Sequence, residues 1–143
     1  MKSNRRLFLA RSLPAVAMLG AKPGQVSGES ASDVLSDACF AHHVLFWLKD
    51  NADKSSYAGV LKALQALKNA KGVKFLHIGA PSISDIDFEA RATDATYTFS
   101  YLALFSSKAD KEEYLKDPLH TQFINNFRDA IARVTIYDSL KIS

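Results

Sequence analysis

The sequence is poor in cysteine and in long apolar runs. Cys39 is the only cysteine among 143 residues, so an internal disulfide is excluded and the thiol is either buried and inert or able to link two chains. The apolar run over residues 12–21 is interrupted by Pro14 and is shorter than the roughly 20 residues that a membrane-spanning helix needs. We therefore expect no stable membrane anchor.

Signals for a bound metal ion or cofactor are also missing. The acidic residues within 81–94 do not have the glycine-centred spacing of a calcium loop, and the chain has no H-E-x-x-H sequence. The neighbouring His42 and His43 point to opposite faces of an expected strand, so they cannot chelate one metal ion together. We predict no metal and no cofactor, and a metal ion held by His43 and His120 remains only the third alternative.

Positive charge is concentrated in the first residues. The chain has 18 Lys and Arg against 15 Asp and Glu, and residues 1–21 contain four of the basic residues and none of the acidic ones. Without this segment the count becomes 14 against 15, a net charge of −1. A nucleic-acid-binding domain needs a basic stripe on its folded surface, so we predict no nucleic-acid partner.

The first 21 residues resemble an export signal. Arg5-Arg6-Leu7-Phe8-Leu9 has the order of the twin-arginine signal, which is two arginines, any residue, then Phe-Leu, and an apolar run follows. Residues 22–37 are mostly small and polar, which is typical of a flexible linker. We expect residues 1–21 to be an export signal peptide and the mature protein to be periplasmic or secreted.

Residues 38–143 have the length of one domain. The expected elements are strands over 41–49, 73–79, 95–105 and 133–140, a helix over 53–68, a short helix over 106–114 and a further helix from Leu119. This order predicts an α+β fold, the ferredoxin-like βαββαβ sandwich, with a four-stranded antiparallel sheet and its helices on one face. The polar connection over 81–94 is long enough to be a lid. The uncovered sheet face would expose apolar side chains, so we expect a second copy to cover it.

Residues 114–123 contain a helix break with an ionisable group on each side. Asp117 before Pro118 is typical of an N-cap followed by a proline at the first helical position. His120 then lies in the first turn, where the positive end of the helix dipole disfavours a protonated ring. We expect a neutral imidazole that can accept a proton, with Tyr114 nearby.

Asp138 lies on the same predicted strand face as Val134 and Ile136. A carboxylate on an apolar face is costly unless it has a partner. This residue is therefore either part of a site or a strand-end residue that reaches solvent.

The chain resembles the stress-responsive dimeric α/β barrel (Dabb) family over residues 41–140. The resemblance depends on His43-Val44-Leu45-Phe46, on Tyr114-x-x-Asp117-Pro118-x-His120-x-x-Phe123 and on Ile136-Tyr137-Asp138. It implies a homodimer in which two sheets close into a barrel with the helices outside. One family member, the plant olivetolic acid cyclase, uses two histidines, a tyrosine and an aspartate. By motif, these roles fall on His43, Tyr114, His120 and Asp138.

The face bearing His43 is expected to meet the helix that begins near His120. In that arrangement the four residues converge on one pocket, with Leu45, Trp47 and Phe123 as apolar walls that bind the substrate.

Two classes of function remain open. An enzyme would be a cofactor-independent lyase or cyclase acting on a small, partly apolar carbonyl compound. In it, His120 takes a proton, Tyr114 stabilises the oxyanion, and Asp138 or His43 orients the imidazole. The alternative is a non-catalytic, stress-related dimeric binding module.

Overall fold

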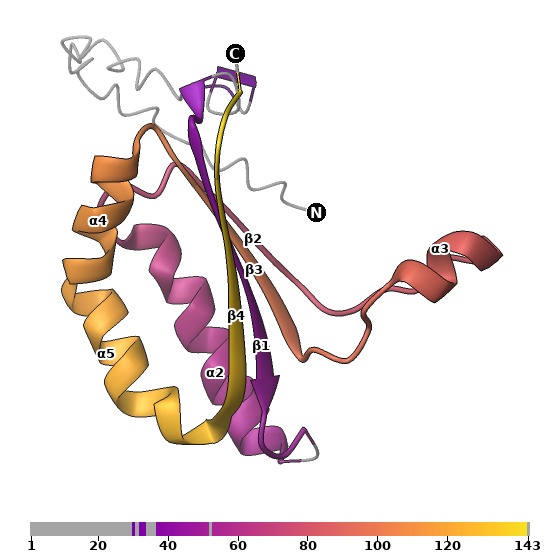
Figure 1. Ribbon diagram of the computed structural model, residues 1–143. Helices are drawn as coiled ribbons and strands as arrows, with labels where there is room; N and C mark the ends of the chain where they lie inside the picture. The colour runs from indigo at the N-terminus through magenta and orange to yellow at the C-terminus, as the bar shows by residue number, and fades with distance from the viewer. Residues whose placement is uncertain (1–29, 31, 34–36, 52, 143) are drawn as a thin grey trace, which may run out of the picture.

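One antiparallel sheet of four strands organises the computed structural model, which describes residues 30, 32–33, 37–51 and 53–142 (Figure 1). The strand order is β2-β3-β1-β4. The strands are β1 (Phe40–Leu48), β2 (Phe75–Gly79), β3 (Phe99–Phe105) and β4 (Ile131–Leu140). Because β1 pairs antiparallel with both β3 and β4, it occupies the interior of the sheet, and the predicted ferredoxin-like arrangement is confirmed.

Three helices lie against one face of this sheet. They are α2 (Lys54–Ala66), α4 (Lys108–Lys116) and α5 (Pro118–Phe127). Short 3₁₀ turns extend two of them, η1 (Leu67–Asn69) after α2 and η2 (Arg128–Ala130) after α5. Figure 1 shows α2, α4 and α5 together on the same side of the strands, as the sequence predicts.

The junction between α4 and α5 is held by one carboxylate. Asp117 ends α4 and caps α5, because its Oδ1 accepts a hydrogen bond of 2.8 Å from the Leu119 N–H. Its Oδ2 accepts a second one, of 3.0 Å, from the Lys71 N–H in the connection that follows η1. Pro118 occupies the first helical position, where no N–H partner is lost. The predicted helix break is therefore confirmed, and it fixes where Tyr114 and His120 lie.

The core lies between the sheet and these helices. Even-numbered residues of β1 face the helices, and their partners on β3 face the same way because paired residues share a sheet face. The large, fully buried side chains are Val60, Leu64, Leu67, Phe99, Tyr101, Phe105 and Tyr114.

The opposite face of the sheet carries a second set of apolar side chains. Odd-numbered residues of β1 lie here, with Leu102 and Leu104 of β3 as the partners of His43 and Ala41. Tyr137 of β4, which pairs with His43, is 58% exposed. A sheet with apolar residues on both faces is unusual for an isolated subunit.

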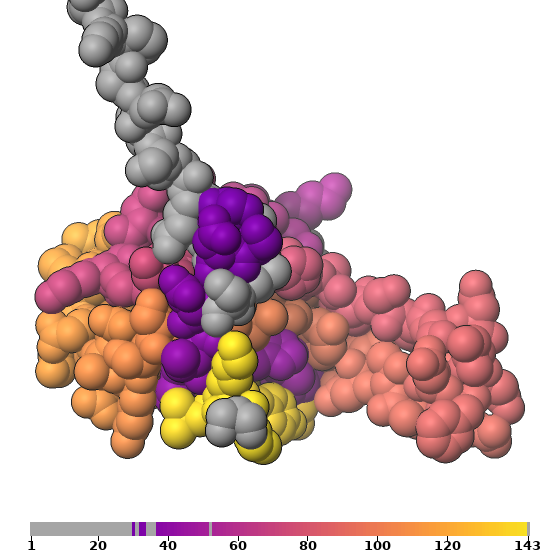
Figure 2. Space-filling model, turned by 90° about the horizontal axis from the view of Figure 1, so that it is seen from above, coloured from indigo at the N-terminus to yellow at the C-terminus, as the bar shows by residue number. Residues whose placement is uncertain are grey.

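The connection between β2 and β3, for which the sequence predicts a polar segment long enough to be a lid, contains secondary structure of its own. It contains a short helix, α3 (Asp87–Ala92), with acidic residues in its first turn and an ion pair of 2.8 Å between Arg91 and Asp87 one turn apart. Ile86 and Phe88 are 63% and 77% exposed. Figure 1 shows α3 projecting away from the sheet on the side opposite the three packed helices, and in Figure 2 the same segment extends away from the rest of the molecule.

The predicted export signal, residues 1–21, lies outside the described residues, as does most of the predicted linker over 22–37. Among the helices that the structure describes, none combines the length and the apolar character needed to cross a membrane.

Candidate active site

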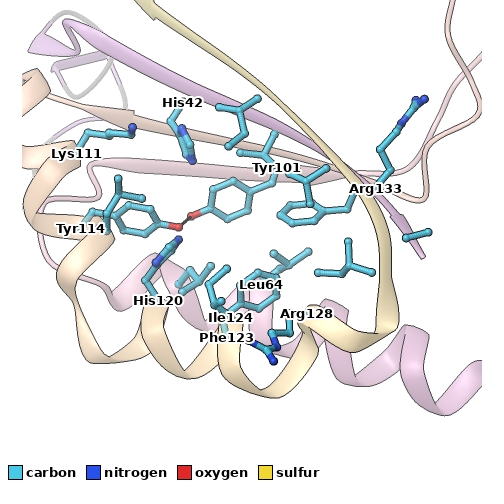
Figure 3. A pocket seen from close by; sticks show the side chains of 18 residues that line it. His42, Leu64, Tyr101, Lys111, Tyr114, His120, Phe123, Ile124, Arg128 and Arg133 are labelled. Carbon is cyan, nitrogen blue, oxygen red and sulfur yellow. Dashed lines mark hydrogen bonds between the residues drawn. The ribbon is translucent and has the colours of Figure 1, made fainter. Parts of the chain in front are cut away.

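A cavity of about 410 Å³ lies between the helix-covered face of the sheet and helices α4 and α5 (Figure 3). Most of its wall is apolar. The wall residues include Val44, Phe46, Leu64, Phe123, Ile131 and Ile136. Cavities of this size that are apolar with a few convergent polar groups are typical of small-molecule sites.

Polar side chains gather at one end of the cavity. They are His42 from β1, Tyr101 from β3, Lys111 and Tyr114 from α4, and His120 from α5. In Figure 3, the hydroxyls of the two tyrosines lie between the rings of His42 and His120. Two strands of the sheet and two of the helices that pack on it therefore contribute to one cluster of ionisable groups.

His42 forms the shortest polar contact of this cluster. Its Nδ1 lies 2.6 Å from Oδ1 of Asp138, the residue directly opposite on β4. An ionised carboxylate can only accept, so Nδ1 carries the proton and Nε2 of the neutral ring is free to accept one. Burial lowers the pKa of His42, although the hydrogen bond and the charge of Asp138 oppose this effect.

Asp138 is bound from two sides. Lys111 Nζ lies 3.1 Å from its Oδ2, and the lysine side chain is itself only 16% exposed. Burial favours the neutral acid, but hydrogen bonds from His42 and Lys111 outweigh burial and lower the pKa of Asp138. The carboxylate predicted to need a partner on this face therefore has two.

Tyr101 and Tyr114 form a buried pair. Their hydroxyl oxygens are 3.0 Å apart, and each residue is 1% exposed. Burial raises the pKa of Tyr101 to about 12, because the phenolate would lose its hydration. Burial also raises the pKa of Tyr114, and the neighbouring Tyr101 adds to the effect. Both phenols are therefore neutral hydrogen-bond donors at physiological pH.

His120 packs edge-on against Tyr114, with ring centroids 4.8 Å apart. Its pKa is lowered, mainly by burial, while a hydrogen bond to the backbone of Leu115 acts in the opposite direction. The lowered pKa agrees with the predicted neutral ring, but its largest cause is burial of the imidazole and not the helix dipole from which the prediction was made.

The prediction that His43, Leu45 and Trp47 face this pocket is wrong. All three lie on the opposite face of the sheet, where His43 Nε2 is 3.0 Å from Ser100 Oγ. The Trp47 indole N–H donates to Thr96 Oγ1 at 3.0 Å on that same face. The cause of the error is that β1 is apolar on both faces, so alternation could not show which parity meets the helices.

Tyr114, His120, Asp138 and Phe123 do come together as predicted, and His42 takes the place assigned to His43. Three residues of the cluster were missed: His42, Tyr101 and Lys111. Tyr101 lies on the same strand face as other aromatic residues, a pattern that indicates a core position. Its hydroxyl could have indicated a polar site, since a buried tyrosine hydroxyl requires a hydrogen-bond partner. Lys111 had no signal, because the sequence does not show that α4 passes Asp138.

Metal binding has no support in the described part of the chain. No group of three or more His, Cys, Asp and Glu residues there is arranged to hold a metal ion. His43 and His120, the pair considered for such a site, lie on opposite sides of the sheet.

Together, the fold and the cavity define an α+β protein of the ferredoxin-like class with a pocket between its sheet and helices. The stress responsive A/B barrel domain family, Dabb, matches residues 40–140, and the chain belongs to this family. None of the curated proteins matches the sequence.

Solved structures share the fold at low identity. A Dabb protein with a ferredoxin-like fold from Mesorhizobium loti is 19% identical, with a TM-score of 0.59 over 74% of this chain and 99% of that one. A hydroxynitrile lyase from Passiflora edulis is 20% identical, with a TM-score of 0.59 over 74% of this chain and 95% of that one. A dimeric ferredoxin-like protein from Thermobifida fusca is 19% identical, with a TM-score of 0.57 over 73% and 92%.

The lowered histidine pKa values predict acid sensitivity. Unfolded histidine titrates near pH 6.5, above the folded values of His42 and His120. The unfolded state therefore binds more protons, and the free energy of unfolding should fall as pH drops through 6.5 toward the folded pKa values. Urea denaturation between pH 8 and pH 5 would measure this slope.

His120→Gln should flatten that slope, because glutamine cannot take up the proton. His77→Gln is the matched control, since His77 is exposed on β2, away from the cluster. An unchanged slope in His120→Gln would contradict the assignment of a buried neutral ring to this position.

Proposed function

We propose that this protein binds a small, partly apolar carbonyl compound in the cavity and acts on it as a cofactor-independent lyase or cyclase. The observation that carries the proposal is the convergence of two neutral histidines and two neutral phenols at one end of an apolar pocket. Such a set supplies both proton acceptors and proton donors without a cofactor.

Each polar residue has a role in this chemistry. His120 takes a proton from the carbon next to the carbonyl, so the C–H electron pair moves toward the carbonyl oxygen. Tyr114 donates a hydrogen bond to that oxygen as negative charge develops. The protonated His120 then returns this proton when a bond to carbon is made or broken, and His42, oriented by Asp138, offers its unprotonated Nε2 as a second proton acceptor.

The apolar wall determines which ligands fit. Phe46, Phe123 and Ile131 would contact a hydrophobic tail while the carbonyl group lies at the tyrosine end. Support from related proteins is at the level of the family, and a hydroxynitrile lyase with the same fold indicates that lyase chemistry occurs on it. The resemblance to the olivetolic acid cyclase through Tyr114, His120 and Asp138 supports the same class.

Deuterium exchange tests the proton-transfer step. Acetophenone in D₂O has an apolar ring and an enolisable methyl ketone, and ¹H NMR follows the loss of its methyl signal. Wild-type protein should accelerate exchange, and His120→Ala should reduce that acceleration by about 100-fold or more, the usual contribution of a general base. His77→Ala should leave it unchanged.

A non-catalytic binding module is the second candidate. It is favoured by the direct hydrogen bond between the two tyrosines and by the ion pairs of Asp138, which satisfy much of the polar cluster internally. Acetophenone that binds, as shown by shifted protein NMR signals, but exchanges no faster than in buffer would support the module and contradict catalysis.

We propose that the protein is a homodimer joined through the uncovered sheet face. The exposed apolar side chains of this face and the existence of dimeric proteins with the same fold support the proposal. Analytical ultracentrifugation at micromolar concentration should give twice the monomer mass.

Leu102→Arg should shift the protein to monomer, because a charge at the centre of this face cannot be buried without a partner. Cys39→Ser is the control and should remain dimeric, since no disulfide is needed. A wild-type protein that sediments as a monomer would refute the dimer.

We also propose export by the twin-arginine route, which is supported by the Arg5-Arg6-Leu7-Phe8-Leu9 order. Replacing both arginines by lysine keeps the charge and should trap the precursor in the cytoplasm. The measurement is the fraction of protein recovered from the periplasm, and an unchanged fraction would indicate a different route.

A further inference from the structure

The two buried tyrosines have one O–H group that is not used in the hydrogen bond between them. Two phenol hydroxyls carry two O–H groups, and the bond of 3.0 Å between Tyr101 and Tyr114 uses one of these as donor. Among the described residues, neither hydroxyl has another hydrogen-bond partner. Both residues line the cavity, so the remaining O–H is available to a ligand there.

The geometry makes the two hydroxyls a short relay. Whichever tyrosine donates to the ligand, its oxygen accepts a hydrogen bond from the other tyrosine. A hydrogen bond received by a donor hydroxyl polarises its O–H, so a chain of two donors binds a negative oxygen more strongly than one phenol alone. Both tyrosines are 1% exposed, so little water competes at their hydroxyls, which strengthens the interaction further.

We propose that Tyr101 and Tyr114 act together as the oxyanion-binding donor of this pocket, and that the ligand belongs to the class of enolates and phenolates. The inference rests on the proposed function for its pocket, and it adds Tyr101 as a positioning residue that acts through its hydrogen bond with Tyr114. His42 and His120, on either side of the hydroxyl pair, are placed to exchange a proton with the bound compound (Figure 3).

The charged groups near the tyrosine pair leave its free O–H available to one negatively charged ligand oxygen. Asp138 is occupied by His42 and Lys111, so it does not compete for the free phenol proton. A ligand that carries only neutral acceptors would gain less from a two-donor chain, because hydrogen bonds to charged groups are the stronger ones.

Binding of 4-nitrophenol tests this inference, because its ionised form differs in colour from its neutral form. Wild-type protein should bind the phenolate form in preference to the neutral form, and should therefore lower the apparent pKa of the bound compound. Tyr101→Phe should weaken phenolate binding about tenfold to 100-fold, the loss expected for a hydrogen bond to a charged group. Titration by absorbance gives both quantities.

Two controls separate the hydrogen bond from packing. Nitrobenzene has the same ring without the ionisable oxygen, so its affinity should be unchanged in Tyr101→Phe. Tyr137→Phe removes one hydroxyl from the opposite sheet face and should bind 4-nitrophenolate as the wild-type protein does. The double variant Tyr101→Phe/Tyr114→Phe should lose no more affinity than the weaker-binding single variant, because the two hydroxyls act as a unit.

The outcomes separate the proposal for the tyrosine pair from the proposal that the cavity binds small apolar compounds. The tyrosine pair is refuted as an oxyanion donor if 4-nitrophenolate binds no more tightly than nitrobenzene, or if Tyr101→Phe leaves the tighter binding of 4-nitrophenolate intact. In either case, binding of nitrobenzene still supports the cavity as a ligand site. If neither compound binds to wild-type protein, the pocket itself is refuted as a site for such ligands. Equal losses for both compounds in Tyr101→Phe would show a packing effect and also overturn the proposal.

Discussion

The register between β1 and β4 is the constraint on which the site depends. It places His42 directly opposite Asp138 in the sheet, and the two side chains meet at 2.6 Å. A shift of β4 by one residue would pair Asp138 with His43, and both side chains would then lie on the other face of the sheet, away from Tyr114 and His120. The backbone pairing of β1 with β4 therefore decides which histidine is available for chemistry.

The second constraint is the Asp117 junction, which relates the two helices to each other. Tyr114 is near the end of α4 and His120 near the start of α5, and the carboxylate of Asp117 caps the second helix while binding the Lys71 N–H. Because the Asp117 carboxylate also accepts a hydrogen bond from the segment after η1, the positions of the tyrosine and the histidine are fixed relative to each other and to α2. The polar cluster thus combines a strand register with a helix cap, and neither uses the residues that would do the chemistry.

Much of the fold could be predicted because its signals are local. The helix break at Asp117-Pro118 and the alternation of β3 are local patterns, and the element order leads to the sheet topology. The face of β1 could not be predicted, since Phe46 and Trp47 are equally apolar and only tertiary contacts distinguish them. Lys111 was missed for a related reason: its partner is 27 positions away along the chain, and only the packing of α4 beside β4 joins them.

Burial determines the charge state of the ionisable groups in the cluster. Burial makes His42 and His120 neutral and keeps both tyrosines protonated, so the groups are mutually compatible only because none carries a full charge. The ion pair between Asp138 and Lys111 lies at the edge of this cluster, where the carboxylate is 33% exposed. A ligand that becomes an anion inside would be the first net charge in the apolar part of the pocket. At the tyrosine end it would be stabilised by hydrogen bonds from neutral donors, and the two phenols are placed there to provide them.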